Sequence, residues 1–150
     1  MIKRISQEQT FPLRSLVLRK SAAFSACILP TDTIVGIYHL GYFVNDRLIC
    51  IGTFFPEDYP ERGEGGMRLR GMATDPEFAG KGYGAELINF AIAELKENHA
   101  VYIWCNARST AAGFYKKLGF TIISEEFEIP GVGPHFNMLY SLNKNEDAVL

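Results

Sequence analysis

The chain of 150 residues is 47% hydrophobic, 21% charged and 13% aromatic, which excludes a disordered chain. Its length lets one domain bury roughly two-thirds of its unfolded surface, so a core needs neither metal nor disulfides. Fifteen Lys and Arg against seventeen Asp and Glu give a net charge of -2. This balance argues against a protein that binds nucleic acid or a membrane surface, because both need a cationic excess. We therefore expect one soluble domain over residues 1–150.

The three cysteines, Cys27, Cys50 and Cys105, are odd in number, widely spaced and set among apolar residues. This pattern predicts buried free thiols rather than a disulfide framework or a metal site. The N-terminal residues lack the apolar segment of a signal peptide, and no run approaches the ~20 apolar residues that span a bilayer. We expect a cytoplasmic protein with no bound metal.

The N-terminal part of the chain is expected to form a strand, a helix and then a hairpin. Residues 2–6 are typical of a short strand, and Thr10 is expected to N-cap a helix with Pro12 in its first turn. Residues 34–44 and 48–55 are rich in β-forming side chains and are separated by a short turn. They are therefore predicted to pair as antiparallel strands.

The middle of the chain is expected to hold a solvated loop and a further strand. Residues 56–66 are rich in Pro, Gly and acidic residues, as in an exposed loop. Residues 67–74 are predicted to form a strand with a bulge at Gly71. Residues 19–32 fit neither a helical nor a strand pattern.

The remaining elements alternate between helix and strand. A helix is predicted from Gly84 to about Asn98, because apolar residues recur every three or four positions: Leu87, Ile88, Ala91, Ile92 and Leu95. A second helix over 110–118 ends at a glycine. Strands are expected at 101–105, 121–129 and 136–142, followed by a polar tail over 143–150. The element order indicates a mixed α/β fold.

A glycine-rich turn precedes the amphipathic helix. Gly80, Gly82 and Gly84 alternate there, and glycine lets successive backbone N–H groups point towards a ligand. The helix N-terminus adds roughly half a positive charge, so the turn suits a phosphate or pyrophosphate. The spacing fits neither a Rossmann dinucleotide site nor a P-loop. The third ligand class is the pyrophosphate of coenzyme A, and the alternative is a flexible turn that only leads into the helix.

Two motifs resemble those of the GNAT superfamily of acetyl-CoA-dependent N-acetyltransferases. The family signature Gln/Arg-x-x-Gly-x-Gly/Ala is matched by Ala79–Gly84 at both glycines, with Ala79 in place of the usual Gln or Arg. The second signature, Ala-x-x-Phe-Tyr-x-x-x-Gly-Phe, appears at Ala111–Phe120. The resemblance implies a GNAT fold, with a mixed, mostly antiparallel sheet of six or seven strands flanked by about four helices.

The resemblance also implies an acetyl-CoA site. It assigns the pantetheine and thioester to the strand before the turn, with the N–H of Met72 or its neighbour as oxyanion donor. Many relatives carry a pantetheine-binding Asn where this chain has Arg108, and Asn106 is the alternative for that contact. The implied cofactor-binding residues are Met72, Ala73, Thr74, Ala79, Gly80, Lys81, Gly82, Tyr83, Gly84, Asn106, Arg108 and Tyr115.

The resemblance assigns catalysis chiefly to Tyr115, which in the family protonates the departing thiolate. A phenol of pKa near 10 is a suitable acid for a thiolate leaving group. His135 is the main candidate for the base that takes the amine proton, and similar Pro-His segments occur in the ElaA-like branch. His39, Glu77 and water remain alternatives, and each of these side chains also has a purely structural interpretation.

The sequence therefore predicts an N-acetyltransferase that uses acetyl-CoA to modify a primary amine by direct attack in a ternary complex. The expected acceptor is a small-molecule or peptide amine, and the protein is expected to be a monomer or a homodimer. The alternative is a GNAT-fold regulatory module that binds acyl-CoA without turnover. Intact Tyr115 favours the enzyme, whereas Ala79 and Arg108 leave the module open.

Overall fold

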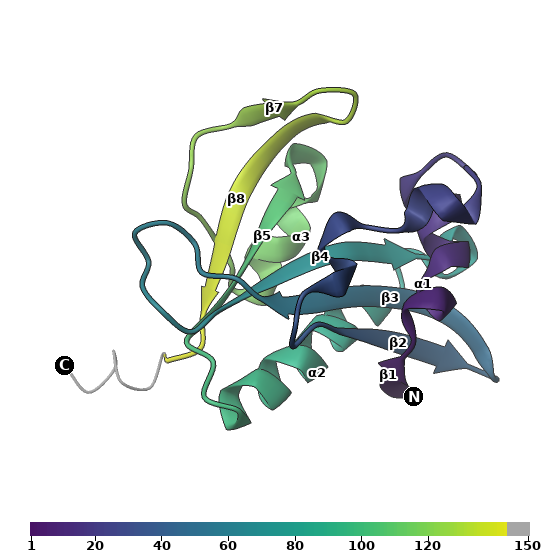
Figure 1. Ribbon diagram of the computed structural model, residues 1–150, viewed down its shortest axis with the longest axis horizontal. Coiled ribbons are helices and arrows are strands. Elements are labelled where there is room, and N and C mark those ends of the chain that lie inside the picture. Colours follow the sequence, from purple (N-terminus) through teal and green to yellow (C-terminus); the bar gives the residue numbers. More distant parts are fainter. Residues whose placement is uncertain (144–150) are drawn as a thin grey trace. The chain divides into compact units, whose positions relative to one another are not determined.

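The computed structural model describes residues 1–143, and the expected polar tail lies outside the described residues except for Asn143. The chain divides into two compact units, and it passes between them after β3, within β4 and within α2. The first unit comprises Met1–Pro56 and Leu69–Ala91, and the second comprises Glu57–Arg68 and the chain from Ile92 onward. Figure 1 shows the elements coloured along the sequence. One domain over 1–150 stays a prediction.

Within residues 1–143 eight strands and three α-helices form. The strands are β1 (Ile2–Ile5), β2 (Tyr38–Val44), β3 (Arg47–Pro56), β4 (Gly66–Thr74), β5 (Tyr102–Arg108), β6 (Thr121–Ile122), β7 (Phe127–Ile129) and β8 (Gly133–Ser141). The helices are α1 (Gln7–Leu13), α2 (Tyr83–Glu97) and α3 (Ala112–Leu118). Shorter π or 3-10 turns are η1 (Arg14–Leu18), η2 (Phe24–Cys27), η3 (Pro30–Thr33), η4 (Pro76–Phe78) and η5 (Ser109–Ala111).

The sheet follows the order β1-β2-β3-β4-β5-β8-β6, with β7 also paired to β8. The β4–β5 pair is parallel, and the β1–β2, β2–β3, β5–β8, β6–β8 and β7–β8 pairs are antiparallel. The expected α/β fold with a mostly antiparallel sheet is confirmed. Among the described residues it has one strand more and one helix fewer than the family pattern predicts.

The extra strand arises because the predicted strand 121–129 is interrupted. Ile122 is opposite Met138, and Phe127 is opposite His135. The chain therefore advances five residues from β6 to β7 while the paired strand β8 advances only three. Two residues of 123–126 are therefore in excess and loop out, which separates β6 from β7. The segment 19–32 contributes only short 3-10 turns.

The first helix begins earlier than the sequence pattern predicts. Ser6, not Thr10, is the N-cap: its hydroxyl accepts from the Gln9 N–H, and the Gln9 side chain accepts from the Ser6 N–H. Thr10 is instead buried, and its hydroxyl donates to the Gln7 carbonyl. The prediction of Thr10 as the N-cap was wrong, because the Ser-x-x-Gln capping box of Ser6 and Gln9 already provides hydrogen-bond partners for N–H groups at the helix start, one turn earlier. Pro12 lies inside the helix.

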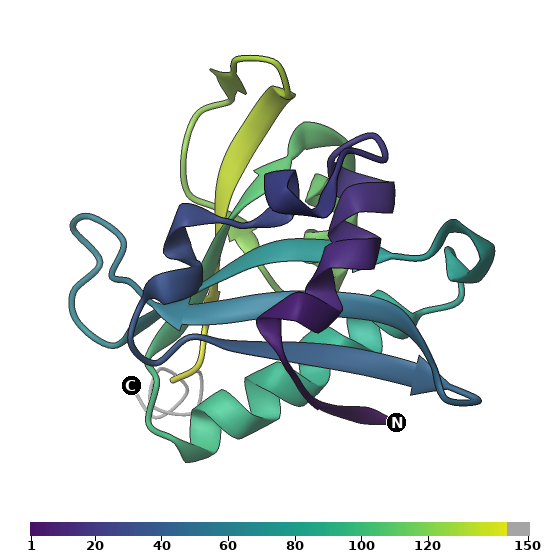
Figure 2. The same ribbon diagram turned by 45° about the vertical axis from the view of Figure 1, so that its right-hand side comes forward.

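In the first unit, helices cover both faces of the strands. Ile51 packs with Ile5, Leu13 and Ala73 in a buried apolar cluster on the side of α1, which Figure 2 shows crossing the strands. The next residue, Gly52, faces the opposite way, and a Cβ there would lie 3.2 Å from the Leu87 side chain of α2. All five residues of the predicted apolar stripe on α2 are buried, which confirms that pattern.

A buried guanidinium ties the N-terminal turns to the strands of the first unit. Arg14 is 1% exposed and forms a bidentate pair with Asp32, at 2.8 and 3.2 Å. It also donates to the Cys27 carbonyl at 3.1 Å and to the Thr53 hydroxyl at 2.9 Å. Burial works to raise the pKa of Asp32, but hydrogen bonds from Arg14 and from the Leu29 N–H outweigh it and hold that pKa below its ordinary value.

His39 extends this cluster as a buried, uncharged member. Its Nδ1 lies 2.7 Å from the Thr53 hydroxyl, and the side chain is almost fully buried. Burial and the nearby charge of Arg14 lower the pKa of His39, against smaller opposing effects of Asp32 and Glu8. These contacts give His39 a structural role.

In the second unit, hydrogen bonds hold the loop between β3 and β4 against β5. The Tyr102 hydroxyl accepts from the Tyr59 N–H and donates to the Gly63 carbonyl, each at 2.8 Å. The Trp104 indole N–H donates to the Glu57 carbonyl at 2.8 Å. The loop over residues 57–65, which was expected to be solvated, is thus held to β5 by these hydrogen bonds.

All three cysteines are free and buried, as predicted. Burial raises the pKa of the Cys105 thiol to about 12 and that of Cys50 above its ordinary value, so both stay protonated at neutral pH. None of the helices formed by residues 1–143 is long and apolar enough to cross a membrane.

His39 makes stability depend on pH. The unfolded chain protonates this residue near pH 6.5, whereas the folded chain resists protonation because the folded pKa is lower. The unfolded state then binds more protons, so the free energy of unfolding should fall as pH drops from about 6.5 to 5.5, by up to about 1.4 kcal/mol per pH unit. His39→Gln should flatten this slope in urea titrations, and exposed His99→Asn should keep it. An equal slope in His39→Gln would contradict the assignment.

Candidate active site

The glycine turn belongs to the first unit and leads from η4 into α2. Asp75 caps η4 by accepting from the Glu77 N–H at 2.9 Å. Gly80 and Gly82 have φ of 75° and 86°, and a Cβ at either position would meet no atom within 4 Å. The first N–H groups of α2 have no partner within the helix by its geometry. The turn therefore presents open backbone donors, which fits the phosphates of a nucleotide cofactor.

An aromatic cluster fixes the start of α2 in the first unit. The Tyr83 ring packs edge-on against Tyr42 at 4.8 Å and Phe78 at 6.0 Å, and the Tyr42 hydroxyl donates to Glu86. Lys81 is exposed, with its Nζ 5.6 Å from the Phe78 ring centre. Tyr42 and Phe78 did not emerge from the sequence, because they are distant from the motif along the chain or outside its signature.

Glu77, an alternative base, is engaged in an ion pair. Arg47 on β3 donates to Glu77 at 3.0 Å and to Asp75 at 2.8 Å. This pairing ties the loop that leads into the glycine turn to β3 and engages one oxygen of the exposed Glu77 carboxylate.

The expected thioester-binding strand is the second half of β4. Gly71 has φ of 67°, a left-handed conformation inside the strand that is typical of a glycine bulge. Ala73 is buried in the apolar cluster under α1, whereas Met72 lies against Gly52 on the other face. The Thr74 hydroxyl contacts the Cys50 sulfur at 3.2 Å. The side chains of these three residues therefore hold the strand, and any cofactor contact would use their backbone.

The other expected site residues lie in the second unit, where strand register determines which share a face. Asn106 is opposite Asn137, and Arg108 is opposite His135. Residues directly opposite each other in an antiparallel pair point to the same face, and alternate residues along a strand do as well. His135 therefore shares one face of the β5–β8 pair with Asn106, Arg108 and Asn137.

A chain of polar contacts runs along this face. Arg68 donates to Glu57 at 3.1 Å and to the Asn106 Oδ1, and its guanidinium lies 4.6 Å from the Trp104 ring centre. The Asn106 amide in turn donates to Asn137 at 2.5 Å. Both ends of the Asn106 side chain are thus engaged within the unit, which disfavours it as the substitute pantetheine ligand.

Tyr115 points to the opposite face. It is 7% exposed on α3, and its ring packs against Phe114 at 5.1 Å and Phe120 at 5.3 Å. Phe120 contacts the ring of Tyr140, which alternates with the residues of the His135 face along β8. The second unit therefore separates the two expected catalytic side chains by the thickness of the sheet.

His135 is held as a potential base. It is 4% exposed, and its Nδ1 lies 2.8 Å from the Gly133 carbonyl. A carbonyl oxygen can only accept, so Nδ1 carries the proton and the neutral ring keeps its lone pair on Nε2. The Phe127 ring stacks on the imidazole at 6.0 Å. The backbone contact thus fixes the tautomer that a proton acceptor requires.

The family model of the acetyltransferase (GNAT) domain matches residues 38–142. An uncharacterized N-acetyltransferase YitI of Bacillus subtilis (strain 168) is 38% identical over 142 residues, which cover 94% of this chain and 95% of that protein. The chain belongs to the GNAT acetyltransferase family. It is accordingly an acyltransferase.

Solved structures show that the GNAT fold extends over nearly the whole chain. A crystal structure of an aminoglycoside 6'-N-acetyltransferase complexed with coenzyme A has a TM-score of 0.74 and 13% identity, covering 95% of this chain and 97% of that one. Escherichia coli ElaA has a TM-score of 0.72 and 18% identity, covering 94% of this chain and 100% of its own. At such identities the likeness concerns the fold alone.

Gly82→Glu tests the glycine turn. A carboxylate placed among the open N–H groups repels phosphates, and we expect CoA binding to weaken on the order of 10–100-fold by isothermal titration calorimetry. Gly63→Glu is the matched control, because Gly63 also has a left-handed φ (81°) with no atom within 4 Å of an added Cβ. Equal CoA affinity in both variants would show that the turn does not hold the phosphates.

Proposed function

We propose that the protein transfers an acetyl group from acetyl-CoA to a primary amine by direct attack in a ternary complex. The observation that carries the proposal is the glycine turn before α2, where the left-handed Gly80 and Gly82 leave the backbone open to a phosphate. Direct transfer also needs an acid at the sulfur and a base at the nitrogen, and Tyr115 and His135 are the candidates for these roles.

The glycine turn supports acetyl-CoA as the donor. Its open left-handed glycines and the N-terminus of α2 suit the pyrophosphate, and Lys81 adds an exposed positive charge beside them. The missing Gln or Arg at Ala79 removes one side chain but no backbone donor. We assign the pantetheine and thioester to the backbone of Met72, Ala73 and Thr74, with the N–H of Met72 or its neighbour at the carbonyl oxygen.

His135 accepts a proton from the amine at Nε2 as the nitrogen attacks the thioester carbon. The new N–C bond forms and the C–S bond breaks, and Tyr115 gives its hydroxyl proton to the departing sulfur. The phenol and a thiol have ordinary pKa values of about 10 and 8.5, so this transfer is nearly balanced. Proton exchange with water then restores both side chains. The products are the acetamide and free CoA.

The direct test is to measure thiol release from acetyl-CoA with a pooled panel of primary amines, alongside the thermal shift caused by acetyl-CoA alone. We expect acetyl-CoA to raise the melting temperature, and at least one amine to release thiol in an amount equal to the acetamide formed. Stabilisation without thiol release from any amine would instead favour the regulatory module. No stabilisation by acetyl-CoA would contradict both.

Tyr115→Phe tests the acid. The ring contacts with Phe114 and Phe120 stay, but the proton donor is lost, so we expect kcat to fall about 100-fold or more while KM for acetyl-CoA stays within about twofold. Tyr140→Phe removes another buried hydroxyl on the same face and should leave kcat within about threefold. An unchanged kcat in Tyr115→Phe would make this residue purely structural.

A further inference from the structure

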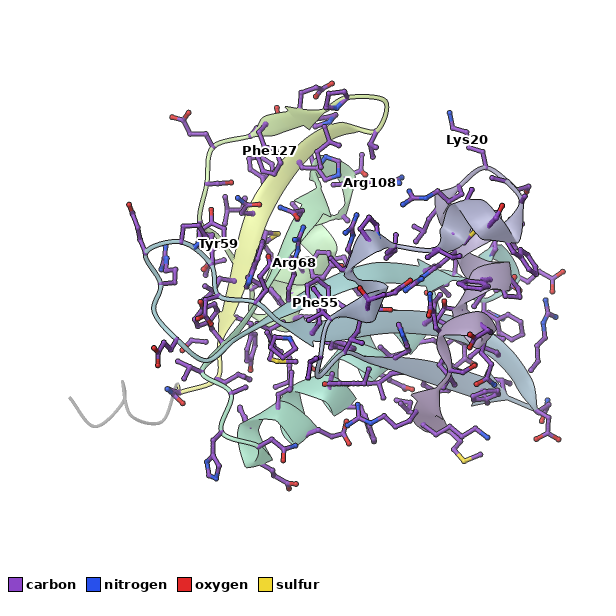
Figure 3. The ribbon with its side chains drawn as sticks, viewed as in Figure 1. Lys20, Phe55, Tyr59, Arg68, Arg108 and Phe127 are labelled. Carbon is purple, nitrogen blue, oxygen red and sulfur yellow. The ribbon has the colours of Figure 1, made fainter. Side chains whose placement is uncertain are left out.

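The face that carries His135 has a composition that bears on the acceptor. We call its part around His135 the polar face and define it by seven of the residues that register places on this side: Arg68, Trp104, Asn106, Arg108, Phe127, His135 and Asn137. Tyr59 covers part of it by accepting from the Asn137 amide at 2.8 Å. Figure 3 labels three residues of the polar face, Arg68, Arg108 and Phe127, together with Tyr59.

The charge on the polar face is positive. Its one engaged carboxylate, Glu57, pairs with Arg68 at 3.1 Å. The acidic residues beside Phe127 are directed elsewhere: Glu126 accepts from the Ser109 hydroxyl at 2.7 Å, and Glu128 alternates to the other side of β7. Among residues 1–143, no carboxylate pairs with Arg108. Arg108 is therefore the cation of the polar face whose charge is not neutralised.

Arg108 is well placed for a ligand that reaches His135. It is exposed at the end of β5, directly opposite His135 in the register. The Cβ atoms of such a pair lie about 4.5–5.5 Å apart. The neighbouring amides are already paired with each other, Asn106 to Asn137. The guanidinium is thus the available donor group beside the proposed base, and its planar fork matches a carboxylate.

Family resemblance puts a pantetheine contact at this position, but two observations favour the acceptor. Arg108 is the direct register partner of His135, the proposed base for the amine. In addition, the pantetheine arm is uncharged, so it offers a guanidinium no anion. A charged side chain is better matched by a charged group of the substrate.

We propose that the acceptor is a small amine that also carries a carboxylate, and that Arg108 binds this carboxylate while the amine lies at His135 Nε2. This inference rests on the proposed function and names its substrate class. Arg108 is then a residue that determines specificity, because a diamine or an amine ester would leave the guanidinium unpaired. The stacked Phe127 ring forms an apolar wall beside the imidazole.

The experiment compares amino acids that differ in the amine-to-carboxylate spacing, namely glycine, β-alanine and γ-aminobutyrate, with their amides and with a diamine. We expect kcat/KM for the preferred acid to exceed that for its amide by at least 10-fold. In Arg108→Gln, KM for the acid should rise about 10–100-fold and the preference over the amide should vanish, while kcat and KM for acetyl-CoA change less than threefold. Arg108→Lys should recover part of the loss.

Arg62→Gln is the matched control, since Arg62 is an exposed arginine of the β3–β4 loop in the same unit, and it should behave as wild type. Equal or better turnover of the amides or the diamine would overturn the inference. So would an Arg108→Gln variant whose main defect is a raised KM for acetyl-CoA, which would place Arg108 at the cofactor.

A binding measurement separates this inference from the proposed function. Calorimetric titration of the preferred acid into the protein with bound CoA needs no turnover. Binding to wild type and loss of binding in Arg108→Gln would support the inference even if no amine released thiol, in which case only the proposed transfer would fail. Absence of acid binding to wild type would overturn the inference and leave acetyl transfer to other amines standing.

Discussion

Side chains of a pleated strand alternate between the two faces of a sheet, and the chemistry of the second unit depends on this alternation in β5 and β8. His135 and Arg108 share one face because they are direct partners, while Met138 and Cys105, also partners, point to the other and are buried. A shift of one residue would bring polar side chains into the core and apolar ones out. The buried row therefore fixes the register, and with it the face of the sheet on which His135 and Arg108 lie.

The first unit depends on a different constraint, the neutralisation of one buried charge. The turns between α1 and β2 are short and contribute few repeating hydrogen bonds, so they need another source of order. Arg14 supplies it by contacting Asp32, the Cys27 carbonyl and the Thr53 hydroxyl at once. Removing one partner of such a pair leaves a buried charge and typically costs about 3–5 kcal/mol. The guanidinium thus holds the N-terminal turns on β3.

The sequence predicted correctly those elements whose pattern depends only on residues close together in the chain. The spacing of apolar residues locates α2, and the alternating glycines locate the turn before it, because each depends only on neighbours in the chain. Ser6 was missed although its partner Gln9 completes a capping box, because Pro12 suggested a later start. The break between β6 and β7 depends on pairing with β8, and the contact of Asn137 with Tyr59 joins residues 78 apart. No local pattern encodes such contacts, so the polar face emerged only from the structure.

The net charge of -2 and the positive polar face are compatible because electrostatic selection acts at short range. At physiological ionic strength, exposed charges separated by more than about 8 Å are largely screened. A ligand beside His135 would therefore be attracted by the charge of Arg108 on the neighbouring strand. The acidic residues elsewhere on the surface would repel it only weakly. The same reasoning applies to the glycine turn, where backbone N–H groups can attract phosphates in a net acidic protein. In both places the local arrangement of donors, not the overall charge, selects the anion.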